Sequence, residues 1–151
     1  MGRVSTSSAG RSAPGLGTSY AGGRLGRPAA GPGSVASWQR RIVALCLDWA
    51  ACTLVAAAVT GGSSMSSRGA EAWLPMGLFL LEATLLTALV GGSFGQVATR
   101  IAVTHLDGRP VSLLVALVRT ALICLVVPPL IYNPDRRGLH DLATATLTVN
   151  R

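Results

Sequence analysis

The sequence contains no lysine and few acidic or aromatic residues. Its 13 basic residues are all arginine, 6 residues are acidic, and aromatic residues make up 5% of the 151-residue chain. Charged residues amount to only 13%, whereas 50% are hydrophobic and the mean hydropathy is +0.50. This balance is unusual for a soluble domain and typical of a small membrane protein, and the length limits the chain to one folded domain.

The excess of arginine gives a net charge of +7 and a pI near 11.0. Such a charge can indicate nucleic-acid binding, but here the arginines flank apolar segments and do not form a basic face beside stacking aromatic side chains. We therefore interpret them as topology signals and as contacts with anionic lipid head groups. The expected partner is the lipid bilayer and not nucleic acid.

The cysteines give no sign of a disulfide framework or a metal site. Cys46, Cys52 and Cys124 are odd in number and all lie in apolar segments, and no CxxC or HxxxH spacing brings them or His105 and His140 together. We interpret the cysteines as small buried hydrophobic side chains. The sequence therefore predicts neither a metal nor another cofactor.

The first 37 residues are rich in Gly, Ser, Ala and Pro and contain no acidic residue or apolar run. We predict a disordered tail over 1–37 and a folded transmembrane domain over 38–151. Because no short apolar region of a secretory signal occurs before residue 42, we expect the first apolar helix to be retained.

Three apolar segments follow, at about 42–60, 73–90 and 111–132. Each is long enough to cross a hydrocarbon core of about 30 Å at a rise of about 1.5 Å per residue. Trp38 and Trp73 stand at segment ends, where an indole ring favours the membrane interface. The pattern predicts an all-α membrane protein with a small bundle of three apolar helices.

Arginine is distributed unequally around the first two segments. The loop 61–72 contains only Arg68, whereas Arg40 and Arg41 precede the first segment and four more arginines lie in the tail. By the positive-inside rule, this places the N-terminus in the cytoplasm and the chain in the cell membrane as a multi-pass protein.

Two short segments have the alternating, β-branched pattern of strands. One is 100–104, which is followed by a turn at Asp107-Gly108, and the other is 145–149 near the C-terminus. These β-like cytoplasmic segments can pair only if they lie on the same side of the membrane.

The third apolar segment leaves two topologies open. Three complete spans would place a C-terminal tail containing Arg136 and Arg137 outside the cell, against the positive-inside rule. Arg119 in the first half and Pro128-Pro129 in the second are consistent with a segment that enters the membrane and returns. The alternatives are three spans and a re-entrant third segment.

Three ionisable residues, Asp48, Glu82 and Arg119, fall at membrane depth. Helix rise places Asp48 and Arg119 about 10 Å from the cytoplasmic end and Glu82 near the middle of the bilayer. Such groups usually pair inside a bundle, so one hypothesis is an Asp48–Arg119 ion pair that fixes helix packing. The other is that Asp48 and Glu82 form an ion or proton site.

His140 and Asp141 are adjacent near the C-terminus, but no serine or cysteine has the setting of a nucleophile. We therefore predict no catalytic residues and no enzymatic activity. Asp141 is expected to accept hydrogen bonds from backbone amides or from Arg40 or Arg41.

Together these residues resemble the RDD family of membrane proteins, which is named for one arginine and two aspartates. The matching residues are Arg40 or Arg41 with Ala44 and Asp48 in the first helix, and Asp141 near the C-terminus. The segments 94–96, 103–110, 116–119 and 137–141 also resemble the family pattern, and the resemblance covers 38–151. The arginine-, glycine- and alanine-rich composition is typical of GC-rich bacteria such as actinobacteria.

The resemblance implies a multi-pass membrane protein that aids transport, with Arg40, Arg41, Asp48, Arg119 and Asp141 as its polar cluster. Three helices seldom enclose a pathway, so transport by this chain requires a homo-oligomer or another membrane protein as partner. The competing hypothesis is a non-transporting accessory or scaffold protein whose buried charges only fix helix packing.

Overall fold

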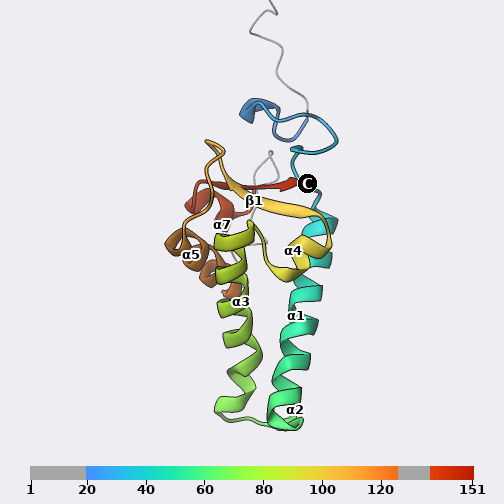
Figure 1. The fold of residues 1–151 in the computed structure, drawn as a ribbon, viewed down its shortest axis with the longest axis vertical. Coiled ribbons are helices and arrows are strands. Elements are labelled where there is room, and N and C mark those ends of the chain that lie inside the picture. Colours follow the sequence, from blue (N-terminus) through green and yellow to red (C-terminus); the bar gives the residue numbers. More distant parts are fainter. Residues whose placement is uncertain (1–19, 126–136) are drawn as a thin grey trace, which may run out of the picture.

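The computed structural model describes residues 20–125 and 137–151. Two long helices, α1 (Trp38–Thr60) and α3 (Leu74–Val90), pack side by side and run antiparallel. The short helices α2 (Ser63–Ser66) and η2 (Ala70–Trp73) connect them at one end. The sheet and the other short helices gather at the opposite end, so a helical hairpin carries a cap at its open end (Figure 1).

Local signals set the ends of both long helices. The Ser37 hydroxyl accepts the N–H of Arg40 and caps the start of α1, and α3 has proline in its first turn. Each helix ends at a glycine with positive φ, Gly61 at 62° and Gly91 at 80°. The segments predicted at 42–60 and 73–90 are confirmed as helices.

The outer faces of the hairpin are apolar. Leu54, Val59 and Leu89 are each more than two-thirds exposed, at 71%, 75% and 79%. The helices α1 and η2–α3 are the two in the described residues that are long and apolar enough to span a membrane. Exposed apolar side chains along such helices suit a lipid environment.

The predicted strands are confirmed and pair with each other. Strand β1 (Ile101–His105) runs antiparallel to β2 (Thr146–Asn150), with Ile101 opposite Asn150. The predicted turn is also present, because the N–H of Gly108, at φ 80°, donates to the carbonyl of His105. Helix α4 (Phe94–Ala98) leads from the end of α3 into β1.

The residues before α1 extend this sheet. Val35 forms a bridge with Val149, the N–H of Ala36 donates to Thr148, and Val35 packs with Leu147 in a small core. The short helix η1 (Gly23–Leu25) precedes them. Residues 33–36 of the tail predicted to be disordered therefore pair with the sheet, and 1–19 lie outside the described residues.

The third apolar segment forms a shorter helix than predicted. Helix α5 (Leu113–Cys124) has 12 residues, about 18 Å, and lies across the end of the hairpin instead of along it (Figure 1). The predicted remainder after residue 125 falls outside the described residues. Because β1 precedes α5 and β2 follows it, their pairing brings the chain back to the same end of the hairpin, which favours the re-entrant alternative.

Candidate functional site

Asp141, in the short helix α7 (Leu139–Ala143), is fully buried and joins three helices. Its Oδ2 lies 2.8 Å from Nη1 of Arg41 in α1, and its Oδ1 lies 3.0 Å from Nε of Arg119 in α5. His140 Nε2 lies 3.4 Å from the same Oδ1. The prediction that Asp141 accepts from Arg40 or Arg41 is confirmed for Arg41.

Strand β2 and Arg137 complete this group. The hydroxyls of Thr146 and Thr148 lie 3.4 and 3.5 Å from the Asp141 carboxylate, and Arg119 Nη2 donates to Thr148 at 3.2 Å. Arg137 donates to the carbonyls of Thr146 and Asp141. We call Arg41, Arg119, Arg137 and Asp141 the arginine–aspartate cluster, which ties α1, α5 and α7 to the sheet.

Electrostatics keep Asp141 ionised. Burial alone would raise its pKa, but the positive charges of Arg119 and Arg41 outweigh burial and lower the pKa from 3.8 to about 2. A carboxylate with this pKa is a fixed negative charge at neutral pH. Asp141 is therefore suited to hold arginines and not to exchange a proton.

Asp48 belongs to a second group, around the start of α4. Its side chain is buried, and Oδ2 accepts from the Ser93 hydroxyl at 2.6 Å while Oδ1 accepts the N–H of Gly95. Glu82 Oε1 accepts the N–H of Phe94 at 2.6 Å. Two carboxylates from the hairpin thus satisfy backbone donors that the first turn of a helix leaves free.

Gly95 allows this close contact between α4 and α1. A Cβ at this position would lie 2.0 Å from the carbonyl oxygen of Ala44 and 3.0 Å from Cγ of Asp48. Contact at that distance with backbone is forbidden, so only glycine fits. The close packing of α4 against α1 beside Asp48 therefore requires glycine at position 95.

The predicted Asp48–Arg119 ion pair is wrong. Asp48 faces α4, whereas Arg119 pairs with Asp141, because α5 crosses the hairpin end and directs Arg119 towards the sheet. Arg40 is exposed and donates to Asn150 Oδ1 at 3.1 Å instead of joining the cluster. The residues predicted for the polar site therefore fall into two groups, Arg41, Arg119 and Asp141 in one and Asp48 and Glu82 in the other, and Arg40 belongs to neither.

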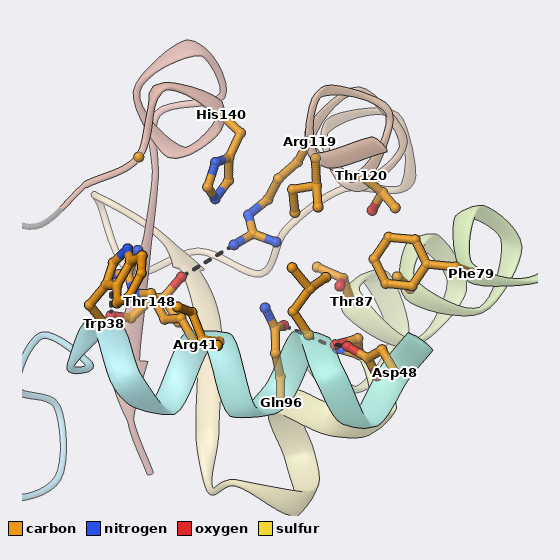
Figure 2. A pocket seen from close by; sticks show the side chains of 16 residues that line it. Trp38, Arg41, Asp48, Phe79, Thr87, Gln96, Arg119, Thr120, His140 and Thr148 are labelled. Atoms are coloured by element: carbon orange, nitrogen blue, oxygen red, sulfur yellow. Dashed lines mark hydrogen bonds between the residues drawn. The ribbon is translucent and has the colours of Figure 1, made fainter. Parts of the chain in front are cut away.

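A cavity of about 280 Å³ lies between the two groups. Figure 2 shows Arg119, His140 and Thr148 towards one end of it and Phe79 and Asp48 towards the other. The apolar part of its lining belongs to α1, α3 and α5, and consists mainly of Ile42, Leu45, Phe79, Ala83 and Ile123. The cavity therefore has a cationic region and an apolar region.

Sequence reasoning missed several residues of these groups. The segment 94–96 was noted only for its family resemblance and Ser93 was not singled out, although Ser93-x-x-Gln96 has the spacing of a capping box, which the structure contains. Arg137 was expected at the lipid head groups but is buried at 8% exposure. Sequence offered no signal for Thr148, since its role depends on strand pairing.

Among residues 20–125 and 137–151, no three His, Cys, Asp or Glu side chains lie close enough together to hold a metal ion. The chemistry that the described groups offer is therefore hydrogen bonding and charge. Arg119 supplies a buried cation at the cavity, and Asp48 supplies a carboxylate that already has two donors.

The comparison with known families gives one match. A model described as the RDD family matches residues 35–145, which include both long helices, α4, β1, α5 and α7. No curated protein and no solved structure matches the chain. The match includes Arg41, Asp48 and Asp141, the positions that carried the resemblance in the sequence, and the chain belongs to the RDD family.

Proposed function

We propose that this RDD-family chain is an integral protein of the cell membrane that contributes to transport of an ion or small solute as an oligomer. In this proposal α1 and η2–α3 cross the bilayer, and the third apolar segment does not cross completely. Both the N-terminus and the sheet then lie in the cytoplasm.

The lengths and ends of the hairpin support the membrane part of the proposal. The two candidate spans have 23 and 21 residues, about 35 and 32 Å at 1.5 Å per residue. Trp38 and Trp73, exposed at 47% and 66%, lie near opposite ends of the hairpin, where interfacial indoles are expected. Arg40, Arg100 and Arg151 are exposed at the sheet end, which supports a cytoplasmic cap.

The observation that carries the transport part is the cavity. It extends from the arginine–aspartate cluster to Phe79 on α3, so a solute bound there would contact residues of both proposed spans. Two spans cannot surround a pathway, and we therefore propose self-association through the apolar faces of α1 and α3.

A scaffold without transport is the second candidate, and the contacts of Asp48 and Glu82 favour it. Both carboxylates accept hydrogen bonds from the start of α4, which gives them a structural role that needs no solute. In this alternative the two polar groups only fix the cap on the hairpin.

Two measurements separate these candidates. Light scattering of the full chain in mild detergent gives its oligomeric state, and vesicles containing a pH-sensitive dye report flux driven by monovalent-cation or anion gradients, with protein-free vesicles as the control. Transport predicts an oligomer and protein-dependent flux. A monomer that produces no flux under any gradient would refute transport and favour the scaffold.

A further inference from the structure

We propose that the cavity between α1, α3 and α5 binds an anionic amphiphile, with its phosphate or carboxylate group on Arg119 and its hydrocarbon chain against Phe79. The inference rests on the proposed function in one respect, that the ligand reaches the cavity from the membrane. It names the class of molecule that the cavity is built to hold.

Arg119 provides the anion-binding group. The residue is only 3% exposed and lines the cavity, and Figure 2 shows its guanidinium directed inward. Its Nε and Nη2 are engaged by Asp141 and Thr148, and no hydrogen bond among residues 20–125 and 137–151 uses its Nη1. Nη1 is therefore available to donate a charge-assisted hydrogen bond to an anionic oxygen in the cavity.

Asp48, the acidic residue of the lining, does not offer a matching site for a cation. Both oxygens of Asp48 already accept hydrogen bonds, from Ser93 and Gly95. Each oxygen therefore already has a donor that partly offsets its charge, and Asp48 offers a cation fewer free lone pairs than an unpartnered carboxylate would. The geometry therefore favours an anion on Arg119 over a cation on Asp48.

The apolar region determines the rest of the ligand. Phe79 and Ala83 are buried in one cluster with Cys52, and Leu45 and Ile123 pack against that cluster. These side chains provide no acceptors or donors to a second polar group, but they offer apolar surface that a hydrocarbon chain can cover. A head group at Arg119 and a chain directed towards Phe79 would match the two regions of the lining.

The size of the cavity sets a limit on what it encloses. Its volume of 280 Å³ equals that of about nine waters at ~30 Å³ each, and lies just below the range of about 300–1,000 Å³ for small-molecule pockets. It can enclose a head group and the first part of one chain. The remaining chain would lie along the apolar faces of the hairpin, as expected for a ligand that comes from the bilayer.

Binding can be measured on the full chain in a neutral maltoside detergent by titration and by thermal shift. The probes are dodecyl phosphate, dodecyltrimethylammonium and inorganic phosphate, which separate the anionic charge from the hydrocarbon chain. We expect saturable binding of dodecyl phosphate that weakens as salt rises, and weaker binding of the other two by roughly tenfold or more. Equal binding of the cationic amphiphile would overturn the inference, and so would equally tight binding of inorganic phosphate.

The matched variants are Ala83→Leu and Ala50→Leu. Ala83→Leu places a larger side chain in the lining and fills part of the cavity, whereas Ala50→Leu makes the same change on an exposed part of α1. Ala83→Leu should weaken dodecyl phosphate binding by roughly tenfold, whereas Ala50→Leu should leave it unchanged. If Ala83→Leu does not fold, Ile123→Phe tests the same filling from α5. Unchanged affinity in a folded cavity variant would place the amphiphile elsewhere and refute the site.

The assay also separates this inference from the proposed transport. Amphiphile binding without flux in vesicles would support the ligand class and refute transport. Flux without amphiphile binding would support transport and refute the ligand class.

Discussion

Arg119 and Asp141 form a buried ion pair between α5 and α7, with 3.0 Å between Nε and Oδ1. Arg119 lies in the first half of the third apolar segment, and Asp141 lies beyond the end of that segment. Their contact joins two parts of the chain that are 22 residues apart. The pairing of β1 with β2 joins the chain segments on either side of them through backbone hydrogen bonds.

The first prediction concerns the energy of this pair. Arg119→Gln or Asp141→Asn alone should destabilise the protein by about 3–5 kcal/mol, because each leaves a buried charge without its main partner. The double variant should lose less than the sum of the two. Thermal or denaturant unfolding in detergent measures these differences.

The matched comparison is the cycle between Asp48→Asn and Arg119→Gln, whose residues do not pair in the structure. Their losses should add within about 0.5 kcal/mol. Strong coupling in this cycle, together with additive losses for Arg119 and Asp141, would contradict the observed pairing.

The second prediction concerns pH. The pKa of Asp141 is lowered in the fold to about 2 from 3.8, so the folded state binds fewer protons than the unfolded state in this range. Its contribution, roughly 2 kcal/mol, is fully present above about pH 4 and is lost as pH falls towards 2. Unfolding free energies measured across this window should decline less in Asp141→Asn, and an equal decline in both proteins would assign the acid sensitivity to other carboxylates.

These contacts also explain what could be predicted from sequence. The long apolar runs and the alternating strands followed from local pattern, and charge gave Arg41 as one of the alternative partners of Asp141, beside Arg40 and backbone amides. The predicted Asp48–Arg119 pair was wrong, because counting residues gives depth along a helix but not the direction in which a crossing helix such as α5 faces. Residue counting placed Asp48 and Arg119 at the same depth. In the structure, Arg119 instead points towards the sheet, where it bonds to Asp141 and Thr148.

The tail and α4 were missed for a different reason. Residues 33–37 have no strong strand pattern and become ordered only because β2 offers them a pairing edge. Gly95 appeared as one small residue among several, and its importance comes from the carbonyl of Ala44, which belongs to a helix distant in sequence. Neither contact is local, so no local propensity could predict it.

The third prediction tests this glycine. Gly95→Ala should destabilise the protein by more than about 2 kcal/mol, because the new Cβ would lie 2.0 Å from the Ala44 carbonyl oxygen and would push α4 away from Asp48. Gly77→Ala is the matched control, since a Cβ in this helical position meets nothing within 4 Å. The control should be neutral or more stable by about 0.5–1 kcal/mol, and similar melting of the two variants would contradict the packing of α4.

The fourth prediction concerns topology. In a background that lacks Cys46, Cys52 and Cys124, single cysteines replace the exposed residues Ala30, Ser66 and Asp107. An impermeant thiol reagent should label Ser66→Cys in intact cells, and the other two only after the membrane is permeabilised. Labelling of Ala30→Cys in intact cells would show that the N-terminus is outside the cell. If only one of Ala30→Cys and Asp107→Cys is labelled in intact cells, the two positions lie on opposite sides of the membrane, which would refute two spans.

The last prediction uses Glu82 to separate transport from a scaffold. Glu82→Gln keeps an oxygen that can accept the N–H of Phe94, but it removes the titrating carboxylate. The fold should therefore persist, with melting close to that of the unchanged protein. In a transporter that uses this carboxylate, pH-linked flux into dye-loaded vesicles should fall strongly, whereas Glu82→Leu should lose both flux and stability because it also removes the acceptor. Flux that survives Glu82→Gln would exclude Glu82 from the mechanism and leave it the role of holding α4 against the hairpin.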